Sequence, residues 1–273
     1  MRERVPVVVQ GRKGNRRGRR GLLRWLWSGA EIAVTLGLVL LLLVAHQLWW
    51  TNRQAREGAE RKVHALEEEW EEEGGGSRGS GDSSGSPDSG TQQPDPSAPA
   101  EDSDDSSPRR RPQADEAPAP APRWDQAYAV LRIPRIGIRV PVAEGVSKSG
   151  VLNKGYVGHY PRTAQPGRSG NFALAGHRNT HGEPFRRIDR LRSGDEVVVE
   201  TRDAVYTYVV GKTLPQTSAR DGGVIAPVPR SSVKAGHGYS SPGYYITLTT
   251  CTPEYTSKYR LIVWGTLQSM RPR

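Results

Sequence analysis

The stretch YYITLTTCTPEYTSKYRLIVWGTL, residues 244–267, holds the single cysteine of the chain, Cys251, between two runs rich in β-branched and aromatic residues. In the first run, residues 244–251, side chains alternate in character with the period of a β-strand. A proline ends that run, and the second run begins at Tyr259. A short loop between consecutive strands favours an antiparallel pair. We therefore expect Cys251 and Arg260 to lie at the same edge of one sheet.

The cysteine and the arginine of this stretch suit nucleophilic catalysis. A thiol becomes a good nucleophile as a thiolate, which a nearby guanidinium or imidazolium favours. The oxyanion formed in acyl transfer also needs hydrogen-bond donors beside the nucleophile, and Arg260 can serve either need. Taken alone, the pair favours a structural alternative, in which Cys251 is a small buried hydrophobe and Arg260 a surface charge. The rest of the chain must decide between the two.

Charge is distributed unevenly along the 273 residues. Residues 1–24 carry nine Lys or Arg and one Glu, residues 51–123 carry nine against seventeen acids, and residues 124–273 carry twenty-one against ten. The formal net charge of +10 is therefore the difference between opposed blocks. It gives no support to nucleic-acid binding.

An apolar run near the N-terminus predicts a membrane anchor. Residues 32–50 are mostly Leu, Val and Ala without formal charge; Trp25 and Trp27 precede them and Trp49 and Trp50 close the run, as at membrane interfaces. A helix of this length spans about 28 Å, the thickness of the hydrocarbon core of a bilayer. By the positive-inside rule, the basic residues 1–31 stay in the cytoplasm and the C-terminal bulk lies outside. A cleavable signal peptide is the alternative, but no small-x-small site follows the long run, so we expect an uncleaved single-pass anchor.

The segment after the anchor, residues 51–123, changes composition along its length. Residues 52–73 are strong helix formers and predict a solvated helical stalk, which the like-charge run EEEWEEE weakens. Residues 74–123 are Gly/Ser-rich and then Pro/Ala-rich, and they bury too little apolar surface to offset the entropy of ordering. We expect them to be a disordered tether.

Residues 124–273 are enough for one well-buried core and form the predicted folded domain. The patterns indicate short strands and little helix, with a brief helix at residues 184–191 and a Pro-rich loop at 224–233. This composition of elements favours a closed or nearly closed mixed β-barrel of seven or eight strands. Strands are expected at residues 130–133, 138–142, 171–177, 196–201, 205–210, 244–251 and 259–267.

A cysteine nucleophile needs a general acid or base, and histidine is the usual one at neutral pH. His177 ends the apolar run NFALAGH, so it too should lie at a strand end, where functional sites gather. His181 and His237 lie in polar or Gly-rich loops and are predicted to be solvated, and His159 is predicted to be a structural hydrogen-bonding residue. The two remaining histidines fall in the anchor and the stalk. His177 is therefore the best-placed partner for Cys251.

Three blocks of the folded domain resemble the signature blocks of the sortases, and they are most similar to those of the class E sortases of high-GC Gram-positive bacteria. The blocks are GHYPRTAQPGRSGNFALAGHR at residues 158–178, TLTTC at 247–251 and YRLIVWG at 259–265. They come in the order that the family shows. A TLxTC strand alone is a moderate signal, and it becomes specific with a GHR strand end upstream and an arginine strand start downstream.

The resemblance implies a cysteine transpeptidase with an eight-stranded mixed β-barrel and short helices. Cys251 would attack a backbone carbonyl, His177 would act as acid and base, and Arg260 would steady the substrate and the oxyanion. A secreted protein carrying a C-terminal sorting signal of LAxTG or LPxTG type would be cleaved between Thr and Gly through a thioacyl-enzyme. It would then be joined to the amine of a peptidoglycan precursor. This chemistry requires no metal or organic cofactor.

Two other functions stay open from the sequence. A tethered, non-catalytic domain would hold anionic wall polymer through the basic surface of residues 124–273. A thiol hydrolase would use water in place of the amine, and nothing in the sequence separates hydrolysis from transfer. An exported chain normally pairs its cysteines, so a single one is either joined to another molecule or free and reactive, and the resemblance favours the second.

Overall fold

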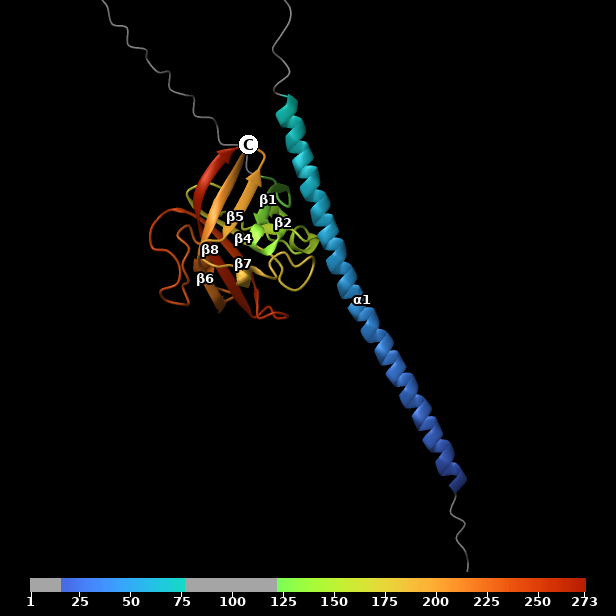
Figure 1. The fold of residues 1–273 in the computed structure, drawn as a ribbon. Helices are drawn as coiled ribbons and strands as arrows, with labels where there is room; N and C mark the ends of the chain where they lie inside the picture. Colours follow the sequence, from blue (N-terminus) through green and yellow to red (C-terminus); the bar gives the residue numbers. More distant parts are fainter. Residues whose placement is uncertain (1–15, 77–121) are drawn as a thin grey trace, which may run out of the picture.

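Eight strands close into a mixed β-barrel in the order β1-β2-β3-β4-β7-β8-β6-β5 (Figure 1). The β2/β3 and β4/β7 pairs are parallel and the other neighbouring pairs are antiparallel. The predicted eight-stranded mixed barrel is therefore confirmed. The strands are β1 (Ala127–Ile133), β2 (Ile138–Glu144), β3 (Val157–His159), β4 (Gly170–Ala175), β5 (Glu196–Thr201), β6 (Ala204–Ser218), β7 (Tyr244–Thr252) and β8 (Tyr259–Pro272).

This computed structural model describes residues 16–76 and 122–273. Residues 1–15 of the expected cytoplasmic segment 1–31 and residues 77–121 of the expected disordered tether 74–123 lie outside the described residues. The short helices of the barrel are of the 3-10 type: η1 (Pro134–Ile136), η2 (Leu152–Lys154), η3 (Ile188–Arg190) and η4 (Gly222–Ile225).

The barrel interior is filled by alternate residues of the strands. Ile246 and Leu248 of β7 belong to the main core, whereas Thr247 between them faces the other side and donates to the Asn171 side chain at 2.8 Å. On the outer face of β8, Trp264 packs with η4 in a second cluster. Both faces are thus covered at residues 245–250 of β7 and 261–265 of β8, next to the strand ends that carry Cys251 and Arg260.

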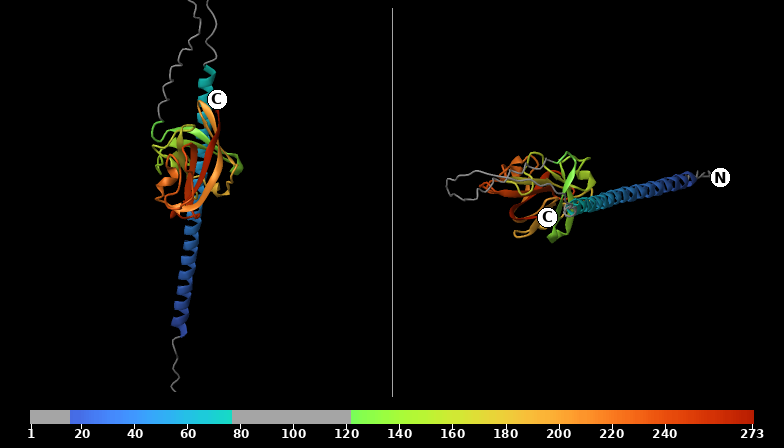
Figure 2. Two further views of the ribbon diagram at one scale, coloured as in Figure 1. Left: turned by 90° about the vertical axis from the view of Figure 1, so that its left-hand side faces the viewer. Right: turned by 90° about the horizontal axis from the view of Figure 1, so that it is seen from above.

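A single long helix, α1 (Arg16–Gly76), contains both the predicted anchor and the predicted stalk. Among the described residues it is the one helix that is long and apolar enough to cross a membrane by length and composition. Its N-terminal half extends beyond the barrel, whereas its C-terminal half lies along the barrel in all three views (Figures 1 and 2). The apolar residues of the predicted span, 32–50, are exposed. The helix therefore fits a single-pass membrane anchor.

The prediction of a solvated stalk is wrong for one face of α1. Residues Val63, Leu66 and Trp70 are buried against Val130 of β1 and Ala143 of β2. The spacing of three and four residues places them on one side of a helix. Because charged residues surround this narrow apolar stripe, the composition of the segment concealed it. The C-terminal half of α1 is thus a packed element of the folded domain.

Candidate active site

Cys251 and Arg260 lie directly opposite each other in the last pair but one of the β7/β8 ladder. Opposed residues of an antiparallel pair project to the same face, and Thr249 and Ile262 form the next pair on that face. Leu261, between Arg260 and Ile262 in β8, belongs to the barrel core, so Cys251 and Arg260 face outward. The expectation that both residues lie at one sheet edge is confirmed.

The Arg260 side chain is bonded to the β7/β8 turn and lines a small pocket. Its Nη1 donates to the carbonyls of Ser257 and Tyr259 at 2.8 and 2.9 Å, which holds the head of the side chain near the β7/β8 turn. Arg260 also lines a pocket of about 160 Å³ together with Tyr160 and Thr249 of the same outer face. A larger hollow of about 710 Å³ lies near the other end of β5, β6 and β8 and includes none of these side chains. We assign the smaller pocket to the site because it adjoins the Cys251 edge.

The structure places His177 at the end of the neighbouring strand. The parallel β4/β7 pairing ends with Ala175 opposite Thr249, and the Gly176 amide then donates to the Thr249 carbonyl at 3.1 Å. In this register, His177, the residue after Gly176, lies level with Cys251. The three candidate residues thus occupy the ends of three adjacent strands, β4, β7 and β8.

The imidazole of His177 is held by its neighbours in a neutral state. Its Nε2 lies 3.0 Å from Asn153 Oδ1, and because a carbonyl oxygen only accepts hydrogen bonds, Nε2 carries the proton. Burial, followed by the charges of His181 and Lys148, lowers the pKa of His177 to about 4. At neutral pH the ring is therefore uncharged, and Nδ1 is free to accept a proton.

His181 corrects a prediction. It was expected to be a solvated loop residue, but its ring stacks on His177 with centroids 5.3 Å apart, and burial lowers its pKa. Its Nδ1 is buried without a hydrogen-bond partner among residues 16–76 and 122–273. The two other assignments hold. His237 is exposed, and His159 is a buried structural residue whose Nδ1 lies 2.7 Å from Glu144.

Arg178, the last residue of the GHR block, is a functional candidate that the sequence reasoning missed. Its side chain is buried, and Nη1 donates to Thr252 Oγ1 at 3.1 Å and to the Cys251 carbonyl at 3.4 Å. Its Nη2 pairs with Asp189 at 3.2 Å. This arginine ties the end of the cysteine strand to the histidine loop. No local spacing signals this role, because Cys251 and Thr252 lie more than seventy positions from Arg178.

Comparisons with known proteins identify the family of this chain. The family model for the sortase domain matches residues 131–268. Over 248 residues the chain is 41% identical to sortase SrtE1 of Streptomyces coelicolor, covering 89% of this chain and 57% of SrtE1. Over 262 residues it is 32% identical to sortase SrtE2 of the same organism, covering 94% of this chain and 87% of SrtE2.

Structural similarity leads to the same family. A crystal structure of sortase E1 from Streptomyces coelicolor, with a tripeptide in its active site, has a TM-score of 0.52 to this chain at 51% sequence identity. The match covers 56% of this chain and 94% of the crystallised chain. The chain spans little more than half the length of SrtE1, although it spans most of SrtE2. From its sequence blocks, its barrel and these relatives, the chain belongs to the sortase family and is most similar to the class E sortases.

Proposed function

We propose that this chain is a cysteine transpeptidase that cleaves a C-terminal sorting signal between Thr and Gly and transfers the protein to a cell-wall precursor amine. One observation carries the proposal: Cys251 lies directly opposite Arg260 in the β7/β8 ladder, with His177 at the end of the adjacent strand β4. Nucleophile, proton carrier and oxyanion donor are thereby brought to one edge of the barrel.

The first half of the reaction uses the neutral imidazole. His177 takes the thiol proton of Cys251, and the sulfur attacks the carbonyl carbon of the signal threonine. The imidazolium then gives its proton to the departing glycine amine as the C–N bond breaks, leaving a thioacyl-enzyme. The low pKa of His177 suits the protonation of the leaving amine, because an imidazolium of low pKa is a strong acid.

Arg260 stabilises the negative charge that develops on the substrate oxygen. A guanidinium has five N–H donors, of which Nη1 serves the turn carbonyls of Ser257 and Tyr259. The other donors are available to the oxyanion and to the peptide backbone. The adjoining pocket of about 160 Å³ takes a side chain of the sorting signal.

In the second half of the reaction, an amine from a peptidoglycan precursor replaces the departed peptide. It loses a proton to His177 and attacks the thioester, and Cys251 leaves as a thiolate that recovers its proton from the imidazolium. The side chains of Cys251, His177 and Arg260 supply every step of this scheme. Helix α1 anchors the enzyme, with its N-terminus in the cytoplasm and the barrel outside.

The test uses the full chain in detergent or nanodiscs, an LAxTG peptide, and an amine such as triglycine. Mass spectrometry should show a peptide joined to the amine, and Cys251→Ala, His177→Ala and Arg260→Ala should each abolish it. If only hydrolysed peptide forms, the enzyme is a thiol hydrolase with water as the acceptor, and the transferase proposal is wrong. No turnover of LAxTG or LPxTG peptides by an intact, folded chain would remove the enzyme proposal altogether. A wall-binding domain would instead bind wall polymer unchanged after Cys251→Ala.

A further inference from the structure

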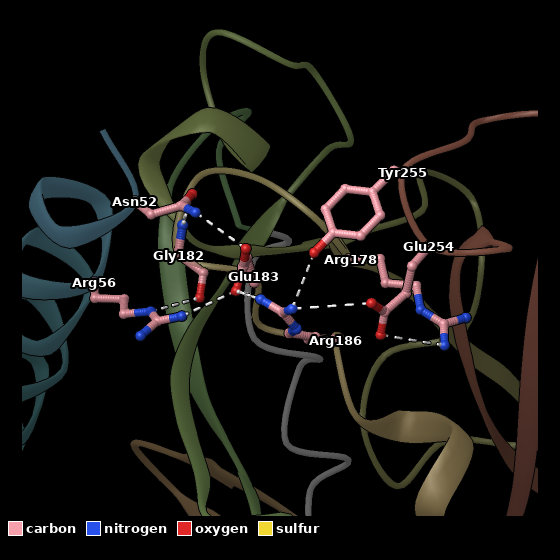
Figure 3. A network of polar contacts seen from close by, with 8 residues as sticks. All are labelled: Asn52, Arg56, Arg178, Gly182, Glu183, Arg186, Glu254 and Tyr255. Atoms are coloured by element: carbon pink, nitrogen blue, oxygen red, sulfur yellow. Dashed lines mark hydrogen bonds and ion pairs between the residues drawn. The ribbon is translucent and has the colours of Figure 1, made fainter. Parts of the chain in front are cut away.

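Helix α1 contacts the barrel at the end that carries the proposed active site. Asn52 Nδ2 donates to Glu183 Oε1 at 3.0 Å, and Arg56 Nη2 donates to Glu183 Oε2 at 3.0 Å (Figure 3). Arg56 Nε also donates to the Gly182 carbonyl at 3.1 Å. Gly182 and Glu183 belong to the loop that follows His177. We call Asn52, Arg56, Gly182, Glu183 and Arg186 the Glu183 network.

Glu183 is unusual because it is a carboxylate whose side chain is only 5% exposed. A buried charge is costly unless it is paired and hydrogen-bonded, and Glu183 meets this condition with Asn52, Arg56 and Arg186. Arg186 also donates to the Tyr255 hydroxyl at 3.3 Å, in the turn between Cys251 and Arg260 (Figure 3). The network therefore connects α1 to both loops that frame the active site.

The backbone is shaped for this close approach. A Cβ at Gly155 would lie 2.8 Å from the carbonyl oxygen of Ala55 in α1, and a Cβ at Gly182 would lie 3.4 Å from Arg56 Cγ. Both glycines also have positive φ, which other residues rarely adopt. The loops at this end thus fit directly against the helix.

The helix is also held at the opposite end of the barrel. Glu73 pairs with Arg202 of the β5/β6 turn at 3.3 Å, and the Arg273 guanidinium lies over the Trp70 ring at 4.7 Å. From Asn52 to Glu73 the helix rises about 31 Å. Polar contacts at both ends and the apolar stripe between them fix the barrel along the helix axis, with its active-site end toward the apolar span (Figure 1).

The position of the Glu183 network along α1 determines how far the network lies from the hydrocarbon core of a membrane that holds residues 32–50. Trp49 and Trp50 close the apolar run, and Asn52 comes only about 3 Å further along the helix, with Arg56 about 9 Å beyond Trp50. The polar layer on each side of the hydrocarbon core is roughly 5–8 Å thick. A bilayer that holds residues 32–50 therefore brings its headgroups level with the loop at Gly182 and Glu183.

The rim of this end has residues that suit such a layer. Tyr255, at the β7/β8 turn, is 75% exposed, and Lys258 in the same turn and Arg220 beyond the end of β6 are exposed cations. Tyrosine is enriched at membrane interfaces, and Lys and Arg are attracted to anionic headgroups.

We propose that the Glu183 network holds the active-site end of the barrel against the lipid headgroup layer of the membrane in which residues 32–50 are embedded. A lipid-linked or membrane-retained substrate then meets Cys251 at the surface where it resides. This inference rests on the proposed membrane anchoring and is independent of the transfer reaction.

The test measures the distance of each barrel end from the lipid surface. In a Cys251→Ser background of the full chain, Ser257→Cys labels the active-site end, and Ser269→Cys labels β8 about 33 Å from the start of that strand at Tyr259. Each fluorophore-labelled protein is placed in phosphatidylglycerol-containing nanodiscs with a nitroxide on the lipid headgroup. Quenching should be several-fold stronger at position 257 than at 269. Equal quenching, or stronger quenching at 269, would overturn the proposal.

A second pair of variants tests the network itself. Asn52→Ala combined with Arg56→Ala should reduce the difference in quenching between the two labels. The matched control, Arg53→Ala, removes an exposed arginine on the same helical turn whose contacts with Glu57 and the Trp49 ring both lie within α1, and it should preserve the difference. If the double variant remains folded by circular dichroism and keeps the full difference, the Glu183 network does not set the orientation. Flotation of the chain with the lipid checks anchoring separately, so its failure would contradict the anchor and not the orientation.

Discussion

The pKa of His177 reports the electrostatics of the proposed site at the scale of one residue. Burial and the positive charges nearby lower this pKa to about 4, and Lys148 is one of them. We expect the imidazole to titrate near pH 4 by NMR, below the ordinary value of about 6.5. Lys148→Gln should raise the midpoint because a like charge is removed. Lys234→Gln, another exposed lysine, is the control, and an identical shift in both variants would contradict the assignment.

The same pKa predicts how acid affects stability. In the unfolded chain His177 binds a proton near pH 6.5, whereas in the folded chain it does so only near pH 4. Between these values the unfolded state holds more protons, so the contribution of His177 to stability is complete above pH 6.5 and is lost as the pH falls toward 4. His177→Gln should therefore show a smaller fall in Tm from pH 7 to pH 4.5 than the parent chain. An unchanged fall would show that other groups cause it.

Arg260 has a role that charge alone does not fulfil. Lysine keeps the positive charge but lacks the planar set of donors that can bind turn carbonyls and oxyanion together. Loss of an oxyanion donor typically costs about 10²–10³ in rate, so Arg260→Lys should lower kcat at least tenfold, with a smaller change in KM. Steady-state transfer kinetics measure both parameters. A kcat within twofold of the parent chain would remove Arg260 from the proposed mechanism.

The strand-end residues of the candidate site were predictable from the sequence, whereas their supporting contacts were not. Period-two alternation and chain breaks locate Cys251 and Arg260, because they belong to strands that pair through one turn. Asn153 and Arg178 escape such reasoning, since their partners are distant in the chain. The solvated assignment of His181 failed because the stacking that buries its ring depends on tertiary structure.

At the scale of elements, the sequence patterns predict the strands that are long and alternate regularly better than short or irregular ones. β3 was missed because it has only three residues, and β6 continues beyond the predicted end at 210 by pairing with β8 through irregular register. The predicted helix at 184–191 is reduced to η3, although Phe185, Ile188 and Leu191 are all buried as their spacing suggests. The three-residue interval suits a 3-10 turn as well as an α-helix.

The apolar stripe of α1 makes a measurable contribution to stability. Leu66 is buried against the barrel, so Leu66→Ala should lower the free energy of unfolding by about 2–4 kcal/mol. Glu68→Ala, on the exposed side of the same turn, should change it little. Denaturant unfolding of a fragment that starts at Thr51 measures both values. Equal stability of the two variants would mean that the helix does not pack on the barrel in solution.

At the scale of the whole molecule, α1 belongs to the folded domain as well as to the anchor. A fragment of residues 124–273 leaves the outer face around Val130 and Ala143 open to water, whereas residues 51–273 retain the helix that covers it. We expect the longer fragment to have the higher Tm and the weaker tendency to aggregate, because the exposed apolar patch is removed. Calorimetry and light scattering compare the two at equal concentration. Equal Tm values would mean that the helix is only a spacer. A higher Tm for the longer fragment would mean that the helix is part of the fold, so that anchoring and folding are coupled. The helix then also supports the loops that carry His177 and the β7/β8 turn.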